Sequence, residues 1–172
     1  MQSPLFVGID VAKDELVVAC SQQSFTAHTV PNTLPELKKF LLTLPANSCI
    51  AMEATGIYHQ QAADLAHKLK LRVYVIHPQD MRHYAQGVGR RAKTDRIDAQ
   101  VIARFLAHEI AHLRPYEPPT LQQRTMDQLL KRRAKIVSLK TALKLSCAQV
   151  LSLKKDTARL LAGFDVLLEK ID

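Results

Sequence analysis

Leu5-Phe6-Val7-Gly8-Ile9-Asp10 is an apolar run that ends on a carboxylate. Its nearly continuous hydrophobicity over a short length predicts a β-strand that is buried on both faces. A short turn leads to a second apolar run, Glu15 to Cys20, and Ser24 to Val30 is a plausible third strand. We expect these three strands to form an antiparallel meander at the start of the chain.

Helical and strand patterns alternate after the meander. Asn32 or Thr33 can cap a helix that has Pro35 in its first turn. The pattern then predicts a strand at 48–52, a helix at 56–69, a strand at 71–76, a short helix from 78, a glycine-containing loop at 87–93 and a helix at 95–108. This order predicts an α/β fold with an antiparallel start and parallel strands after it.

The pattern changes after the proline-rich stretch 114–119, where a helix is improbable. Leu129, Ile136, Leu143 and Val150 recur every seven residues and predict a helix over about 120–153. A second helix is expected at 156–169. The two helices form either an antiparallel hairpin or a coiled coil with another chain. We therefore expect one domain at 1–114 and a basic helical region at 120–172.

Composition points to a polyanionic partner. The 172 residues carry a formal net charge of +8, of which residues 121–172 contribute +6. The three cysteines form no CxxC pair, which fits a reduced cytosol. No run approaches the roughly 18 apolar residues of a membrane helix, and no signal peptide is evident. A cytoplasmic protein without a membrane partner is expected.

Four acids stand where a strand ends or a helix begins: Asp10, Glu53, Asp95 and Asp98. Carboxylates gathered at one sheet edge suit Mg²⁺, or Mn²⁺, and two-metal phosphodiester chemistry. Each acid also has an ordinary structural interpretation, because Asp95 can cap a helix and Asp98 can complete a capping arrangement. A buried strand that ends on an unpaired acid is nevertheless costly, which favours the metal site when the four are taken together.

Basic residues adjoin these acids and also lie in the helical region. The loop and the start of the following helix contain Arg90, Arg91, Lys93 and Arg96, which can guide a phosphate backbone towards the acids. The later run Lys131-Arg132-Arg133 is a second candidate contact with nucleic acid. Either cluster can instead be a solvated surface.

The four acids lie within three short segments: Val7 to Lys13, Met52 to Gly56 and Lys93 to Ala99. These segments resemble the DEDD transposases of bacterial insertion sequences, also called bridge-RNA-guided recombinases, and the related Piv-type invertases. The resemblance implies a RuvC-like, RNase H-like domain whose four metal-binding acids match Asp10, Glu53, Asp95 and Asp98. It also implies a coiled coil that matches the heptad region, DNA as a partner, a structured guide RNA and a homo-oligomer.

Members of this family are usually about twice as long, and a C-terminal domain supplies their serine nucleophile. We expect this chain to correspond to their N-terminal half, with the serine-bearing domain absent. The predicted function is the metal-binding part of a transposase or recombinase that cleaves and rejoins DNA. Two alternatives are a nucleic-acid-binding and dimerisation module without activity of its own, and a junction-resolving endonuclease. An actin-like ATPase also begins with a Gly-Ile-Asp strand, but the five glycines here form no phosphate loop.

Overall fold

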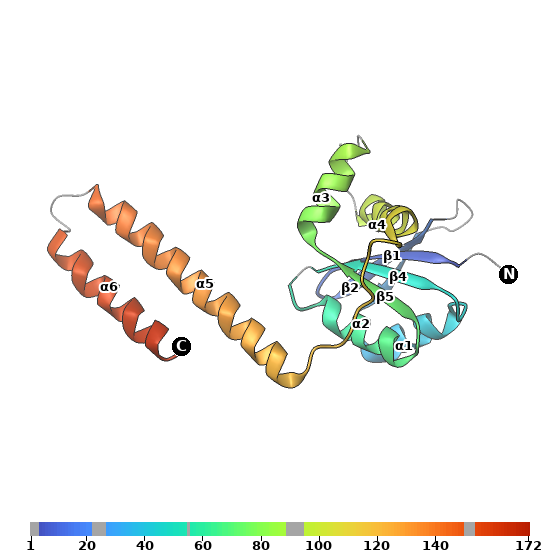
Figure 1. Cartoon of the computed structure of the whole chain (residues 1–172), viewed down its shortest axis with the longest axis horizontal. Helices are drawn as coiled ribbons and strands as arrows, with labels where there is room; N and C mark the ends of the chain where they lie inside the picture. Colours follow the sequence, from blue (N-terminus) through green and yellow to red (C-terminus); the bar gives the residue numbers. More distant parts are fainter. Residues whose placement is uncertain (1–3, 22–26, 55, 89–94, 150–153) are drawn as a thin grey trace. The chain divides into compact units, whose positions relative to one another are not determined.

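The apolar run at the start of the chain becomes the central strand of a five-stranded sheet in the computed structural model (Figure 1). This strand, β1, spans Phe6–Val11, and four of its six residues are buried. The structure describes residues 4–21, 27–54, 56–88, 95–149 and 154–172.

Strands and helices follow the order that the sequence predicts. The further strands are β2 (Glu15–Cys20), β3 (His28–Pro31), β4 (Cys49–Glu53) and β5 (Arg72–Ile76). The helices are α1 (Leu34–Thr43), α2 (His59–Lys68), α3 (Pro78–Gly87), α4 (Asp95–Glu109), α5 (Leu121–Ala148) and α6 (Lys154–Glu169). β3 begins later than the expected strand over 24–30, and residues 22–26 lie outside the described part of the chain. Gly87 is still helical, so α3 extends to the residue where we had expected a loop.

The sheet has the strand order β3-β2-β1-β4-β5. β1 pairs antiparallel with β2, and β2 pairs antiparallel with β3, which forms the expected meander. β1 pairs in parallel with β4, and β4 pairs in parallel with β5. Pro31 closes β3 at an edge of the sheet, where the missing backbone N–H is tolerated. The expected mixed α/β sheet with flanking helices is confirmed.

Helices cover both faces of the sheet (Figure 1). On one face, α1 and α2 pack on Val7, Ile9 and Met52 through buried Leu, Phe and Ala side chains. On the other face, α4 and α3 cover Ala51 and Ile76. Successive residues of a strand point to opposite faces, so each strand contributes to both cores. This explains why β1 and β4 are apolar almost throughout.

The chain divides into two compact units, residues 1–118 and 119–172. In the second unit, α5 and α6 form an antiparallel hairpin. Arg133 pairs with Asp172, just beyond the end of α6, and Lys140 pairs with Asp165 in α6. A step of seven residues forward along α5 thus corresponds to a step of seven residues back along the second arm, as the antiparallel arrangement requires. Of the two arrangements considered for the heptad region, the structure thus shows the hairpin within one chain.

A capping box fixes the start of α5. The Thr120 hydroxyl accepts a hydrogen bond of 3.2 Å from the backbone N–H of Gln123, whose side chain accepts one of 2.7 Å from the N–H of Thr120. Such reciprocal bonds satisfy N–H groups that lack partners in the first helical turn. Helix formation therefore starts directly after the prolines. Within the described residues, no helix has the length and apolar character to cross a membrane.

Candidate metal centre

Asp10 and Glu53 lie at equivalent positions on two neighbouring parallel strands, β1 and β4. Ile9 of β1 is paired with Met52 of β4, and each strand then continues to its acid. Because Ile9 and Met52 lie in the core under α1 and α2, Asp10 and Glu53 point to the opposite face, which α4 covers. Both acids are half-buried. The expected juxtaposition of these two strand ends is therefore present in the backbone.

Helix α4 approaches β1 at Gly8 more closely than any side chain would allow. A Cβ atom added to Gly8 would lie 2.1 Å from the carbonyl oxygen of Ala99 and 2.4 Å from the nitrogen of Ala103. Ala99 and Ala103 are fully buried. The three small residues let two backbones touch, which fixes the distance of α4 from the sheet.

The contact at Ala99 places the beginning of α4 near the acid-bearing end of β1. Ala99 packs on Val17 and Ala19 of β2, and Val17 is the strand partner of Asp10. Asp98 directly precedes Ala99 and is half-buried. Asp95 begins α4 one turn earlier, and its side chain lies outside the described part of the structure. The positive end of the α4 dipole also favours negative charge in this turn.

The described side chains do not by themselves complete a metal site. Among them, no three His, Cys, Asp or Glu residues are grouped so that they could hold an ion. Asp10, Glu53 and Asp98 each make a hydrogen bond or an electrostatic interaction within the structure. The Asp95 side chain is not among the described ones, so neither statement covers it. The donor set is all carboxylate, which is the ligand chemistry that Mg²⁺ and Mn²⁺ prefer.

The predicted basic contacts fall into two groups. Arg90, Arg91 and Lys93 lie outside the described residues, as does the side chain of Arg96, although Arg96 belongs to α4. In α5, Lys131 lies 2.8 Å from the carboxylate of Asp127, Arg133 pairs with Asp172, and an Arg132 guanidinium nitrogen donates to the carbonyl oxygen of Gln128 at 3.4 Å. Two cations of that run are thus partly neutralised within the hairpin.

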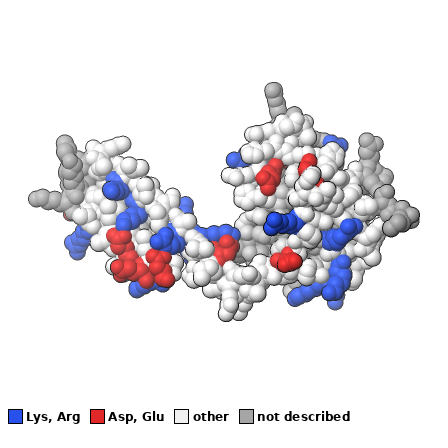
Figure 2. Space-filling view, viewed as in Figure 1, with Lys and Arg blue, Asp and Glu red and all other residues white. Residues whose placement is uncertain are grey.

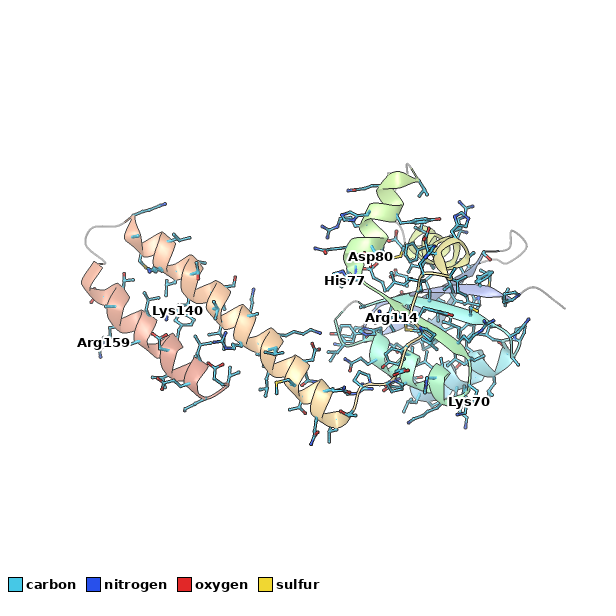
Figure 3. The ribbon with its side chains drawn as sticks, viewed as in Figure 1. Lys70, His77, Asp80, Arg114, Lys140 and Arg159 are labelled. Carbon is cyan, nitrogen blue, oxygen red and sulfur yellow. The ribbon has the colours of Figure 1, made fainter. Side chains whose placement is uncertain are left out.

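Sequence reasoning missed the residues that position the site. Gly8 was noted only for its place before Asp10, and Ala99 and Ala103 were not singled out. Their spacing of four residues on α4, opposite a glycine in a buried strand, is the signal that could have identified them. His77 has a structural role: its side chain caps α3 by accepting a hydrogen bond of 3.2 Å from the N–H of Gln79 (Figure 3).

Three residues of the sheet strands, Cys20, Cys49 and Tyr74, have shifted pKa values. Burial raises the pKa of the Cys20 thiol to about 11. Burial also raises the pKa values of Cys49 and Tyr74, and the nearby Arg72 guanidinium partly opposes both shifts. The dominant cause is desolvation of the charged form. These groups therefore belong to the hydrophobic core.

Comparison with known proteins gives a family. The family model DEDD_Tnp_IS110, described as Transposase, matches residues 7–154. The Pilin gene-inverting protein of Moraxella bovis is 30% identical over 143 residues, which are 76% of this chain and 42% of that protein. Its counterpart from Moraxella lacunata is 29% identical over 139 residues, with the same two coverages. This chain thus spans less than half the length of these relatives.

Among solved structures, Thermus thermophilus RuvC superimposes with a TM-score of 0.47 at 15% identity, covering 65% of this chain and 99% of RuvC. RuvC in complex with a Holliday junction substrate gives a TM-score of 0.49 at 14% identity, covering 66% and 100% of the two chains. The family match covers most of the chain, including the strands of Asp10 and Glu53 and the whole of α4. The chain therefore belongs to the DEDD_Tnp_IS110 transposase family.

Proposed function

We propose that this chain supplies the metal-binding part of a DNA transposase or recombinase, which cleaves and rejoins DNA strands during transposition of an insertion sequence. One observation carries the proposal. Asp10 and Glu53 follow paired residues on parallel strands and face α4, the helix that begins with Asp95 and contains Asp98. Family membership supports DNA as the substrate.

In this proposal, Asp10, Glu53, Asp95 and Asp98 hold Mg²⁺ or Mn²⁺. When bound, such ions activate a nucleophile and stabilise the leaving oxygen in phosphodiester cleavage. The close Gly8–Ala99 contact positions Asp98 relative to Asp10. Arg90, Arg91, Lys93 and Arg96 lie next to the acids in the sequence and attract the phosphate backbone.

Titration calorimetry with Mg²⁺ and Mn²⁺ tests the site. We expect wild type to bind and the double variant Asp10→Asn/Asp98→Asn to lose binding. The variant Asp80→Asn/Asp156→Asn is the matched control, since it removes the same charge from two exposed positions in α3 and α6. Equal binding by all three proteins would show that the four acids are not the metal site. Circular dichroism of each variant establishes that it is folded.

A second candidate is a nucleic-acid-binding and oligomerisation module. It is favoured by the apolar side chains on α5 and α6 that are half or more exposed: Leu121, Met126, Leu130, Leu145, Val166 and Leu167. Exposed apolar surface of this kind is typical of interaction sites. Under this proposal the hairpin associates with a second copy, and Lys131, Arg132 and Arg133 contact DNA or a structured guide RNA.

Charge reversal at Lys131, Arg132 and Arg133 tests the module. Loss of nucleic-acid binding by this triple variant, with binding retained by Asp10→Asn/Asp98→Asn, would support the second candidate. Sedimentation of Leu145→Lys/Val166→Lys against wild type tests the association. A monomeric wild type would argue against an oligomer formed through the hairpin.

A further inference from the structure

A group of exposed cations lies at the sheet edge opposite Asp10 and Glu53. The acids stand near the carboxyl ends of β1 and β4, whereas Lys68, Lys70 and Arg72 surround the beginning of β5. β5 is parallel to β4, so its beginning belongs to the other edge. We call Lys68, Lys70 and Arg72 the basic edge. The five residues of β4 separate the two edges by about 13 Å along the strand.

The surface around the basic edge carries further positive charge. Lys and Arg side chains gather on this part of the sheet unit in Figure 2, in the region where Figure 3 labels Lys70. Lys38 and Lys39 are exposed on α1, which packs beside α2. Among the described residues, none of these five cations forms an ion pair with a carboxylate. The nearby Asp64 instead accepts a hydrogen bond of 2.8 Å from the Tyr116 hydroxyl.

Lys70 occupies a backbone position that favours glycine. Its φ is 64°, in the left-handed region, and it is the only non-glycine residue with positive φ among those described. The N–H of Lys70 donates to the carbonyl of His67 at 3.0 Å, and that of Leu71 donates to Ala66 at 3.1 Å. These two bonds form a Schellman motif, in which glycine usually stands where Lys70 does. Because strained backbone positions often mark functional sites, the exposed Lys70 side chain is a candidate for a functional role.

Arg72 is held in place while it stays exposed. One guanidinium nitrogen donates to the backbone carbonyl of Asn47 at 3.3 Å. An arginine has five N–H donors in a planar fork, so this bond leaves donors for a further acceptor. Its orientation is partly fixed, which lowers the entropy lost on binding an anion. Lys68, Lys70 and Arg72 therefore form a group of exposed donors that has no carboxylate partner within the described part of the chain, and the Arg72 side chain is already held in place.

We propose that the basic edge binds the phosphodiester backbone of a nucleic-acid segment separate from the one at the acids. This deepens the proposed function, since it adds a second contact for the same class of substrate. Phosphate contacts of this kind position a nucleic acid without reading its sequence. DNA and RNA share the phosphodiester chemistry, and the experiment distinguishes them.

The test measures binding of the full chain to a labelled DNA duplex and to a labelled RNA hairpin over a range of salt concentrations. The variant Lys68→Gln/Lys70→Gly removes two cations of the basic edge. We expect it to bind about tenfold more weakly at low salt, with a salt slope that is smaller by about two. The Lys70→Gly change also relieves backbone strain, so the variant should unfold at a temperature no lower than wild type. Weaker binding then cannot be attributed to unfolding.

Arg159→Gln/Lys170→Gln is the matched control, because it removes the same charge from exposed positions of the other unit. We expect its affinity and salt slope to stay close to those of wild type. Loss with the duplex alone, or with the hairpin alone, assigns the basic edge to DNA or to RNA. Equal loss in the control would make the effect one of net charge and overturn the proposal, as would unchanged binding by Lys68→Gln/Lys70→Gly.

The binding result for the basic edge is independent of the calorimetry result for the metal site. If calorimetry detects no metal binding but Lys68→Gln/Lys70→Gly still weakens nucleic-acid binding, the basic edge stands and the metal assignment fails. If the metal binds and this variant behaves as wild type, the reverse holds. Failure of wild type to bind either nucleic acid would overturn the basic edge.

Discussion

Gly8 and Ala99 meet backbone to backbone, so that a Cβ atom at Gly8 would lie 2.1 Å from the Ala99 carbonyl oxygen. This contact joins the central strand to the helix that carries Asp98. The atoms that this Cβ would meet belong to the backbone of α4 and not to a flexible side chain. Removing the clash would therefore require α4 to move away from β1. The position of the candidate metal centre thus depends on a residue that has no side chain.

We predict that Gly8→Ala lowers the free energy of unfolding by about 2–4 kcal/mol, since overpacking against backbone cannot relax locally. Denaturant unfolding measures the change. Gly163→Ala is the control, because Gly163 lies in α6 with nothing within 4 Å of an added Cβ. There we expect a gain of about 0.5–1 kcal/mol from the higher helix propensity of alanine. Similar effects at both positions would show that the close approach to α4 is not required.

The Tyr116 side chain ties the segment after α4 to α2. Its hydroxyl donates to Asp64 at 2.8 Å in a partly buried setting, and its N–H donates to the carbonyl of Val73 at 2.7 Å. We predict that Tyr116→Phe costs about 1–2 kcal/mol of unfolding free energy, because a carboxylate loses a hydrogen bond. Tyr84→Phe makes the same chemical change at an exposed bond of 3.2 Å to His108 and should cost below about 0.5 kcal/mol. Equal losses of unfolding free energy in the two variants would mean that the partly buried bond to Asp64 stabilises the fold no more than the exposed bond to His108 does.

The strain at Lys70 can be measured apart from any binding. A non-glycine residue in the left-handed region costs about 1–2 kcal/mol of stability. Glycine removes this cost, but its greater conformational freedom stabilises the unfolded chain and offsets part of the gain. We predict that Lys70→Gly raises the free energy of unfolding by about 0.5–1 kcal/mol. Lys70→Ala keeps the Cβ atom and removes the charge, so its stability should stay within about 0.5 kcal/mol of wild type. A stabilised Lys70→Ala would point to charge repulsion instead of backbone strain.

Local patterns in the sequence were enough to predict the sheet. Alternating strand and helix signals gave the order of elements, and parallel neighbours necessarily bring the ends of β1 and β4 together. The heptad spacing of Ile136 and Leu143 left the hairpin and the intermolecular coiled coil open, because both bury the same stripe. The ion pair between Arg133 and Asp172 supports the hairpin, but this pair is evident only in the structure.

Contacts between distant backbones could not be predicted in the same way. Gly8 has no side chain whose pattern could signal a partner, and Ala99 lies in an ordinary apolar helical stripe. The prolines around Tyr116 excluded a helix but gave no sign of its bond to Asp64. The assignment of Asp10, Glu53, Asp95 and Asp98 as metal ligands stays a prediction, for which calorimetry is the direct measurement.

Burial of Cys20 in β2 makes the stability of the sheet unit sensitive to alkaline pH. Burial raises the pKa of this thiol to about 11, above its value in the unfolded chain. Its contribution to stability is therefore fully present below the unfolded pKa and is lost as the pH rises towards 11. We predict that unfolding free energy falls more steeply from pH 9 to pH 11 in wild type than in Cys20→Ala, by at most about 1.4 kcal/mol per pH unit. Comparing the two slopes by denaturant unfolding cancels the titration of other groups. Parallel slopes would show that the Cys20 thiol titrates alike in the folded and unfolded chain.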